Sequence, residues 1–254
     1  MMRIVHISDL HFGLHVDAII EPFLEHLKRI RPDLIIISGD LTHRARTKQY
    51  FLFQNFLQQL PTPVLMVPGN HDIPLYNFIA RFLSPFKKYK KYVSKELFSH
   101  FENEEINILG VNSATPYRIK NGEFSHEVIH RIQTHFSTKH QRLNILFFHH
   151  NLYQFSGMHH PLNNAEHFIQ YLQQSPIHLV CTGHLHYANV KNITQENKIN
   201  CVILHAGSLL SPRRKDNHNS FYVIQTDQLH CRIELQVYHE NAFLTESAYS
   251  YLFE

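Results

Sequence analysis

The chain has few cysteines, no long apolar run and little excess of charge. Cys181, Cys201 and Cys231 are odd in number and far apart, and no Cys-x-x-Cys pair is present. This argues against a disulfide framework and against a zinc site made of thiolates. No apolar run approaches the length that crosses a bilayer, and the apolar part of the N-terminus is too short for a signal peptide. We therefore expect a soluble cytoplasmic protein with reduced, mostly buried thiols.

The charge and the motif content narrow the classes of function further. A net charge of +3 with neutral histidines is too small to indicate nucleic-acid binding by itself. No Gly-x-Gly-x-x-Gly motif follows the first apolar run, which excludes a simple dinucleotide-binding fold. Because there is also no internal repeat, low-complexity tract or linker, we predict a single domain over residues 1–254, of which 43% are hydrophobic.

Apolar runs typical of strands alternate with amphipathic segments along most of the chain. The predicted strands lie at 2–8, 34–38, 64–67, 106–112, 143–148 and 177–181. The predicted helices lie at 17–31, 47–60, 126–137 and 163–174. This alternation predicts a parallel sheet with right-handed crossovers. Three later runs follow at short spacing, which suggests antiparallel pairing and a second sheet packed on the first; they are 201–205, 220–226 and 230–239.

Residues 73–105 interrupt the alternation with a basic and aromatic segment. Its cations are Arg81, Lys87, Lys88, Lys90, Lys91 and Lys95. Its aromatic side chains are Tyr76, Phe78, Phe82, Phe86, Tyr89 and Tyr92. Two interpretations stay open: an insertion that lies over the active edge of the sheet, or a solvated helical excursion whose aromatic side chains pack on the core.

Polar side chains follow five of the predicted strands, at the point where each strand ends. The five motifs are Asp9-Leu10-His11, Gly39-Asp40, Gly69-Asn70-His71-Asp72, His149-His150-Asn151 and Gly183-His184-Leu185-His186. Open α/β sheets bind ligands at the carboxyl ends of their strands. Each motif alone is weak evidence, because the chain contains 23 histidines, but the ordered set of five indicates a shared site.

The residue types in these motifs favour a metal centre. In Asp9-x-His11 and in His184-x-His186, both side chains can point to the same side of an extended turn. A carboxylate such as that of Asp40 can bridge two ions, because it has two oxygens and a negative charge. Imidazole and carboxamide ligands suit Mn, Fe, Zn or Co better than Ca or Mg. We therefore predict a metal site with Asp40 at its centre.

The order Asp-x-His, Gly-Asp, Gly-Asn-His-Asp, His and Gly-His-x-His resembles the calcineurin-like metallophosphoesterase superfamily, from Asp9 to His186. The resemblance implies an α/β fold, a four-layer α/β-β/α sandwich of two mixed β-sheets flanked by helices. It also implies two divalent metal ions. One ion would take Asp9, His11, Asp40 and His186, and the other would take Asp40, Asn70, His149 and His184. His149 is preferred to His150 because the family's ligand is the first residue after the strand; Asn151 stands where many members have a proline.

The resemblance further implies a mechanism in which two ions hold a phosphate and a hydroxide that bridges them attacks phosphorus. His71 would protonate the leaving oxygen or stabilise charge beside it, with Asp72 orienting the ring. The alternative is that His71 only caps the turn. Four residues are candidates for substrate contact, and we expect one of them to touch the substrate: Asn112, Ser208, Arg213 and Arg214.

Within the superfamily, the Gly-Asn-His-Asp form and the late Gly-Ser…Arg segment look most like the class III cyclic nucleotide phosphodiesterase branch. We therefore predict a phosphodiesterase for a small nucleotide-type substrate, with cyclic nucleotides among the candidates. A nuclease or a glycerophosphodiester phosphodiesterase is the alternative, and residues 76–95 are compatible with a nucleic-acid strand. A non-catalytic scaffold is a further alternative, against which the complete ligand set argues.

Overall fold

The computed structural model describes residues 1–137, 142–196 and 198–253. Strand β2 (Leu34–Ile37) shows how the layers of the fold arise, because all four of its residues are buried. Successive side chains of a strand point to opposite faces. Ile36 therefore packs in the core between two sheets, whereas Ile35 and Ile37 pack beneath helices. A strand that is apolar on both faces is typical of the middle of a parallel sheet.

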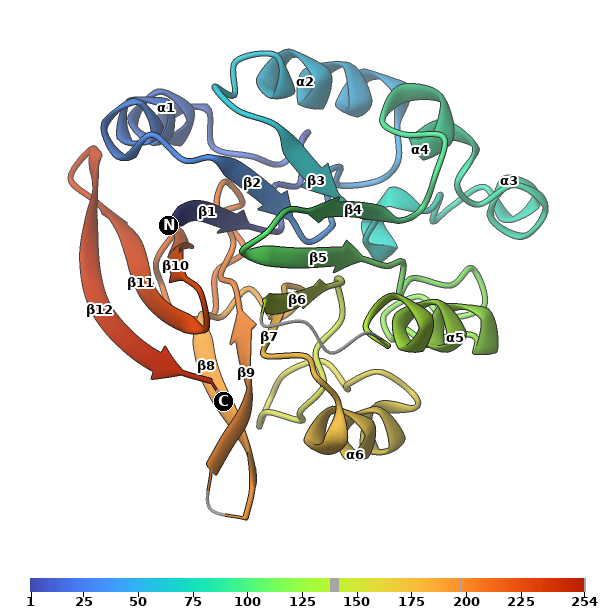
Figure 1. The fold of residues 1–254 in the computed structure, drawn as a ribbon. Coiled ribbons are helices and arrows are strands. Elements are labelled where there is room, and N and C mark those ends of the chain that lie inside the picture. The colour runs from blue at the N-terminus through green and yellow to red at the C-terminus, as the bar shows by residue number, and fades with distance from the viewer. Residues whose placement is uncertain (138–141, 197, 254) are drawn as a thin grey trace.

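The first sheet combines strands from both ends of the chain. Its order is β12-β11-β10-β1-β2-β3, in which β1, β2 and β3 are parallel and the other neighbours are antiparallel. The helices α1 (Ile20–Ile30) and α2 (Thr47–Leu57) cover its outer face (Figure 1). The remaining strands are β1 (Met2–Ile7), β3 (Val64–Met66), β10 (Ser220–Asp227), β11 (His230–His239) and β12 (Ala242–Leu252).

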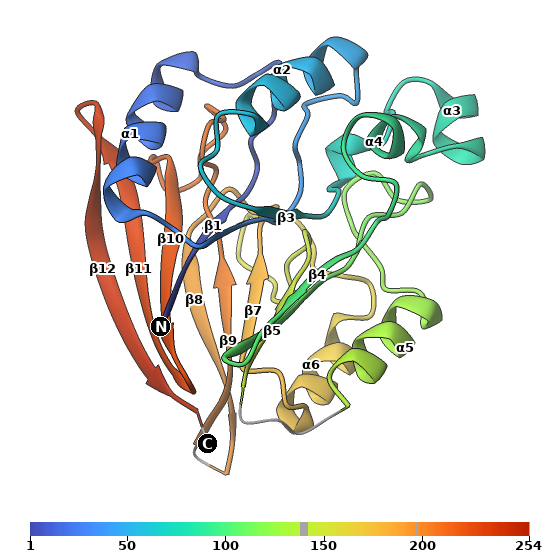
Figure 2. The same cartoon turned by 45° about the horizontal axis from the view of Figure 1, so that its top comes forward.

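The second sheet has the order β4-β5-β6-β7-β9-β8, with antiparallel strands only at its two edges. The helices α5 (His126–His135) and α6 (Ala165–Gln174) cover its outer face (Figure 2). Its strands are β4 (Ser99–Glu102), β5 (Ile106–Gly110), β6 (Leu143–Phe147), β7 (Leu179–Thr182), β8 (Asn189–Gln195) and β9 (Lys198–His205).

These layers confirm the predicted four-layer sandwich of two mixed sheets. The predicted antiparallel pairing is confirmed for β10 and β11, whereas β9 departs from the prediction because it lies in the other sheet. Strand β9 lies parallel to β7 in the second sheet, and β10 and β11 extend the first sheet from β1. Spacing along the chain indicates hairpins, and β8–β9 and β10–β11 are hairpins. Each of β9 and β10 also pairs with a strand that is not its neighbour in the chain, β7 and β1 respectively, which no local signal reports.

The segment 73–105 forms α3 (Phe78–Leu83), α4 (Lys87–Tyr92) and the edge strand β4. Its aromatic side chains divide into a buried set and an exposed set. Tyr89 is buried, and Phe86 and Tyr92 pack with it on the helical side of the first sheet. The side chains of Phe78 and Phe82 on α3 are instead exposed to solvent.

The cysteines and the lengths of the helices bear on two expectations from the sequence. Cys181, Cys201 and Cys231 are buried and free, as the spacing of the cysteines predicts. No helix within the described ranges is both long and apolar enough to cross a membrane.

The interior between the sheets yields a first prediction. Phe147 is fully buried there, so we expect Phe147→Ala to lower the free energy of unfolding by about 3–5 kcal/mol, the usual loss for such a cavity. Phe78→Ala removes the same atoms from a side chain that is 68% exposed, and a change below about 0.5 kcal/mol is expected. Urea unfolding followed by circular dichroism measures both, and equal losses would contradict this core.

Candidate metal centre

The five motifs meet where the strands β1, β2, β3, β6 and β7 end. Backbone hydrogen bonds join their loops: Asp9 N donates to Gly39 O at 3.2 Å and His11 N to Asp40 O at 2.9 Å. Gly183 N donates to His149 O at 2.9 Å in the second sheet. The predicted convergence of the motifs on one edge is therefore present in the structure.

The backbone of these loops is strained at the predicted ligands. Asp9, His11, Asp40, His184 and His186 have φ angles of 54°, 48°, 53°, 73° and 53°. Non-glycine residues seldom occupy this left-handed region, at a cost of about 1–3 kcal/mol each. Such strain clusters at functional sites, where it aims side chains that a regular strand would direct elsewhere.

Close approach explains the glycine that precedes Asn70. A Cβ atom at Gly69 would lie 2.1 Å from Asp40 Oδ1 and 2.4 Å from the Asp40 backbone nitrogen. No larger residue fits there without displacing Asp40.

Asp9, His11, Asp40 and His186 form the first group of side chains. His186 Nε2 lies 3.1 Å from Asp9 Oδ1 and 3.0 Å from His11 Nε2. His11 Nε2 lies 3.5 Å from Asp40 Oδ2. The four potential ligand atoms all lie within 4.8 Å of one another, which is close enough to surround one ion.

Asp40, Asn70, His149 and His184 form the second group. His149 Nε2 lies 3.3 Å from Asp40 Oδ1 and 3.1 Å from Asn70 Oδ1, and His184 Nδ1 lies 3.3 Å from His149 Nε2. The amide of Asn70 donates to Ile119 O, so its oxygen faces the group. The two oxygens of Asp40 thus face two different sets of ligands.

The charges of these buried groups are coupled. Although burial favours the neutral acid, nearby histidines, His149 foremost, hold the pKa of Asp40 well below its usual range. Burial opposes the charged form of His149 as well, but the Asp40 carboxylate raises its pKa to about 9. Burial lowers the pKa of His11 to about 4 and holds that of His184 well below its usual range. The last two rings are therefore neutral, as metal ligands must be.

One buried oxygen and the donor types of the cluster fit metal ions. Asp9 Oδ1 is buried and accepts no hydrogen bond of regular geometry, although His186 Nε2 lies 3.1 Å away. Buried polar atoms are almost always satisfied by a partner, so each such atom requires an explanation. A divalent ion bound among carboxylate oxygens, imidazoles and a carboxamide would explain Asp9 Oδ1, and this donor set suits Mn, Fe, Zn or Co.

Supporting contacts orient the candidate ligands from behind. The Nδ1 atom of His149 bonds to Ser38 O at 2.9 Å, and Nδ1 of His186 donates to the carbonyl of Arg213. Each contact leaves Nε2 facing the cluster. Histidines that bind a metal through one ring nitrogen are usually held in this way through the other. Ser208 donates to Asp9 O at 2.8 Å and so supports the loop of Asp9.

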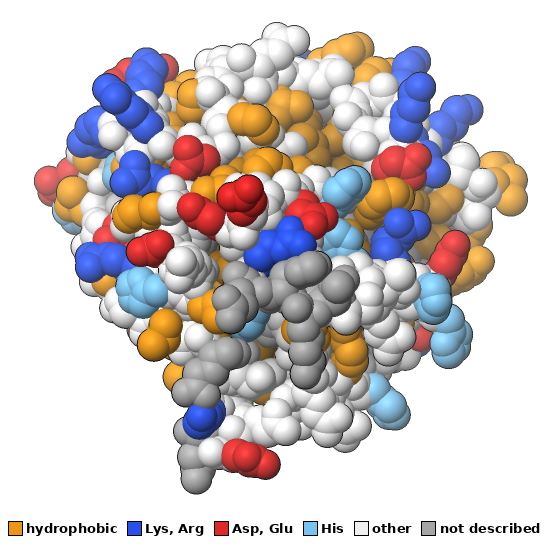
Figure 3. Space-filling model, viewed as in Figure 1, with side chains coloured by type: hydrophobic (Ala, Val, Ile, Leu, Met, Phe, Trp, Pro, Cys, Tyr) orange, Lys and Arg blue, Asp and Glu red, His pale blue; other side chains and the backbone are white. Residues whose placement is uncertain are grey.

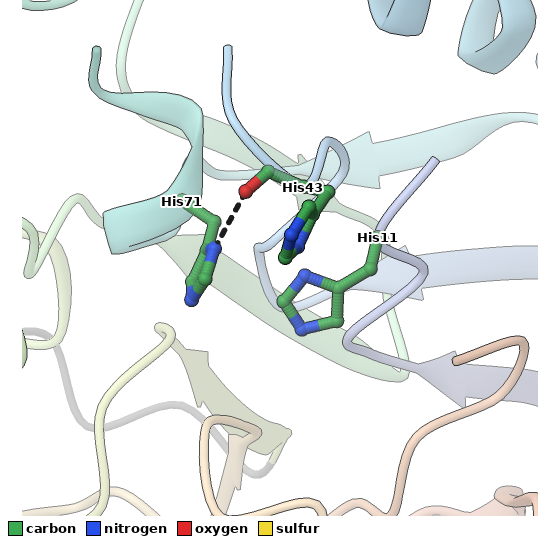
Figure 4. A group of neighbouring side chains, drawn as sticks. All are labelled: His11, His43 and His71. Atoms are coloured by element: carbon green, nitrogen blue, oxygen red, sulfur yellow. Dashed lines mark hydrogen bonds between the residues drawn. The ribbon is translucent and has the colours of Figure 1, made fainter. Parts of the chain in front are cut away.

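His71 lies beside the first group, with its ring across from that of His11 at a centroid separation of 4.7 Å (Figure 4). Its Nδ1 bonds to His43 O at 2.7 Å, and the ring of His43 is stacked 5.5 Å away. The Arg44 guanidinium also contacts His71 Nδ1 and donates to the same carbonyl. The Nε2 of His71 remains available at the site.

Asp72 does not orient the His71 ring, which corrects that prediction. Its carboxylate accepts hydrogen bonds from the backbone N–H groups of Leu41, Thr42 and Gly69 and from the Thr42 hydroxyl. Burial, together with the charge of Asp40, raises its pKa to about 7. Asp72 therefore ties the loop after β2 to the Asn70 turn, and the carbonyl of His43 orients His71 instead.

Three other residues named in the sequence analysis are held by contacts outside the two ligand groups, although the ring centroid of His150 lies only 4.6 Å from that of His184. His150 bonds to the Ser113 hydroxyl at 2.8 Å through Nδ1, which leaves His149 as the histidine beside Asp40. Asn112 folds back onto Ala114 through two hydrogen bonds. Asn151 donates to backbone carbonyls of its own loop, where a proline could not.

A cavity of about 470 Å³ opens above the cluster, and Asp40, Asn70 and His71 are among its lining residues. Of the four predicted substrate contacts, Arg213 and Arg214 line it, whereas Asn112 and Ser208 do not. The sequence analysis missed three further cations and one histidine at the cavity: Arg44, Lys120, Lys215 and His159. Only Arg44 carried a usable signal, because it follows Asp40 in the same loop.

Comparisons with known proteins agree with this geometry. A probable cyclic nucleotide phosphodiesterase of Vesicomyosocius okutanii is 29% identical over 117 residues, which cover 43% of this chain and 45% of that protein. The DNA double-strand break repair protein Mre11 of Methanococcus maripaludis is 27% identical over 232 residues, covering 82% of this chain and 57% of that protein. The chain thus spans about half the length of these curated relatives.

A solved structure shares the fold of this chain, and a family model identifies its family. A dimetal phosphatase from Danio rerio has the same fold, with a TM-score of 0.67 at 12% identity over 96% of this chain and 98% of that one. The model of the calcineurin-like phosphoesterase family matches residues 2–188, a range that contains all five motifs. The chain therefore belongs to the calcineurin-like phosphoesterase family.

Proposed function

We propose that the chain is a dinuclear metal-dependent phosphodiesterase for a nucleotide-type substrate, with cyclic nucleotides among the candidates. The observation that carries the proposal is the division of the ligand cluster at Asp40. Its Oδ2 faces His11, 3.5 Å away, and its Oδ1 faces His149, 3.3 Å away. A carboxylate in this position can bind one divalent ion through each oxygen, with a separate set of neutral and acidic ligands around each ion.

The ligand sets follow from the two groups. Asp9, His11, Asp40 and His186 would hold one ion, and Asp40, Asn70, His149 and His184 would hold the other. When bound, the two ions would supply Lewis acidity toward the phosphoryl oxygens and activate the attacking water.

The protein's own side chains would bind the phosphate and move a proton. Arg44, Arg213 and Arg214 line the cavity and can pair with phosphoryl oxygens, for which guanidinium geometry is suited. The bond of His71 Nδ1 to His43 O fixes the ring. In its protonated form, His71 would then donate from Nε2 to the leaving oxygen. The cavity of about 470 Å³ lies in the range usual for small-molecule sites.

Removal of the bridging carboxylate tests the metal centre. We expect Asp40→Ala to bind fewer than two Mn²⁺ ions per chain and to lose bis-p-nitrophenyl phosphate turnover by more than about 100-fold. The reason is that loss of a residue that only hydrogen-bonds a metal ligand already lowers metal affinity or activity by about 10–100-fold. Asp17→Ala removes a carboxylate that is 88% exposed and should change neither value.

Metal stoichiometry and turnover are measured on metal-stripped protein to which Mn²⁺, Zn²⁺, Fe²⁺ or Co²⁺ is returned. Turnover by folded protein without added metal would contradict a dinuclear mechanism. Two bound ions with no turnover of any ester would favour a non-catalytic scaffold instead.

The leaving group tests the role of His71. A p-nitrophenolate leaves without help from an acid, whereas an alkoxide needs a proton. We therefore expect His71→Gln to slow hydrolysis of an alkyl phosphodiester by about 10²–10⁴-fold, the range for general acid catalysis, but that of the p-nitrophenyl ester by much less. His160→Gln, at an exposed histidine, is the matched control. Equal losses on both esters would assign His71 to the structure of the turn.

A nuclease that acts on a nucleic-acid end is the second candidate function. The similarity to the repair protein Mre11, which extends over most of this chain, and the cations of the cavity support it. Turnover of a single-stranded oligonucleotide that exceeds turnover of cyclic nucleotides, and that falls steeply with salt, would favour this alternative.

A further inference from the structure

The short helix α3 buries its charged side chain and exposes its apolar side chains to solvent. Its only charged residue, Arg81, is 3% exposed, whereas the apolar side chains of Phe78, Ile79, Phe82 and Leu83 are between 50% and 81% exposed. A surface helix ordinarily turns its apolar face to the core and its charges to solvent.

Hydrogen bonds of Arg81 hold the helix in this orientation. Its Nε donates to Pro116 O and its Nη2 to Arg118 O, each at 2.7 Å, and its Nη1 donates to Pro74 O at 3.2 Å. A buried guanidinium with three carbonyl partners is costly to expose or to leave unpaired. These contacts tie α3 to residues 116–118. They therefore also fix the apolar side of the helix toward solvent.

Exposed apolar side chains of α3, of the residue Tyr76 before it and of residues 117–119 make up a group that we call the apolar rim. Phe82 and Tyr117 lie with ring centroids 6.1 Å apart. The rim lies at the edge of the molecule where α3 projects, beside the lysines of α4 (Figures 1 and 3). Contiguous apolar surface of this kind usually marks a binding site. Its members are Tyr76, Phe78, Ile79, Phe82, Leu83, Tyr117 and Ile119.

The apolar rim is continuous with the candidate active site. Ile119 belongs to the rim and also lines the cavity, as does Leu75, the residue before Tyr76. The ring of Tyr76 lies 6.0 Å from the guanidinium of Arg44, which contacts His71. A molecule bound at the metal centre therefore meets the rim as soon as it extends out of the cavity on this side.

Charge distinguishes the two parts of this surface. Five cations line the cavity, whereas the rim contributes only hydrocarbon and aromatic surface. A ligand that matches both has an anionic centre and a long apolar substituent. Amphiphiles of this kind lie among other anionic head groups, which attract cations. Helix α4 exposes three lysines that can supply this attraction: Lys87, Lys90 and Lys91.

We propose that the apolar rim binds the acyl chain of an amphipathic phosphodiester whose phosphate lies in the cavity. This inference rests on the proposed phosphodiesterase function and names its substrate class: one substituent of the phosphate is nucleotide-type and the other bears the hydrocarbon chain. In the reaction, the oxygen of water bonds to phosphorus, and the bond from phosphorus to the ester oxygen beside His71 breaks. That oxygen leaves with a proton.

Two other occupants of the rim are outcomes of the test below. Ile79, Leu83 and Ile119 offer hydrocarbon surface that suits an acyl chain, whereas the rings of the other four members could also stack on bases of a single-stranded nucleic acid. A second copy of the chain would bring the lysines beside the two rims, Lys120 among them, toward each other, and like charges at an interface are unfavourable.

Chain length is the variable that tests the proposal. We compare kcat/KM of the metal-loaded full chain for p-nitrophenyl methyl phosphate and p-nitrophenyl dodecyl phosphate, both below their micelle concentrations. The dodecyl ester should be preferred at least about tenfold, because each methylene buried on the rim contributes roughly fourfold. In the triple variant Phe78→Ser, Ile79→Ser, Leu83→Ser, the ratio should fall to about one.

A matched control changes exposed apolar residues far from the site. Leu244 and Leu252 on β12 are 58% and 74% exposed, and the double variant Leu244→Ser, Leu252→Ser should keep the dodecyl preference. A binding measurement separates this inference from the proposed function. Calorimetric titration with dodecyl methyl phosphate and with dimethyl phosphate should show the same preference without turnover.

Each outcome decides a different point. If neither ester is hydrolysed with any metal, the phosphodiesterase function fails, but titration still tests the rim. If the wild-type ratio is near one, or survives in the triple variant, the rim does not bind the chain. Light scattering that shows a dimer lost in the triple variant, without dependence on chain length, would assign the rim to a second copy. Oligonucleotide binding lost in the same way would assign it to nucleic acid.

Discussion

The carboxylate of Asp40 is the interaction on which the rest of the site depends. It is buried and lies between histidines that come from both sheets, His11 on one oxygen and His149 on the other. A buried charge persists only with partners of opposite charge or with metal ions. The stacking of the sheets places these partners, and His149 is additionally held by Ser38 of the opposite sheet. The edge that carries the candidate ligands is thus the place where the two sheets are joined electrostatically.

The surrounding fold stabilises loops that would be unfavourable alone. Five candidate ligands have left-handed backbone conformations, a cost of several kcal/mol that the loops cannot offset with their own few contacts. Two apolar interiors border these loops, one between the sheets and one beneath α1 and α2. Strands buried on both faces hold the loop ends in place, which is why a strained geometry can persist there.

The region above the metal centre divides into parts with different chemistry. Cations and His71 lie near the ligands, and the apolar side chains around α3 lie farther out. The helix α3 is held by Arg81 through contacts to two separate loops. The candidate metal ligands all lie in the five motifs, within the range that the family model matches. The features around α3 belong to the segment between the third and fourth motifs and are described by contacts of this chain alone.

The sequence by itself determined the types and the order of the candidate ligands, because each motif directly follows an apolar run whose period is a local signal. The four layers of the fold followed from the family resemblance that these motifs carry. Only the tertiary structure decided which groups meet beyond the motifs. His43 rather than Asp72 holds the His71 ring, Asn112 and Ser208 turn away from the cavity, and β10 pairs with β1. These outcomes depend on contacts between distant residues and on turn geometry. No pattern within one segment of the chain encodes them.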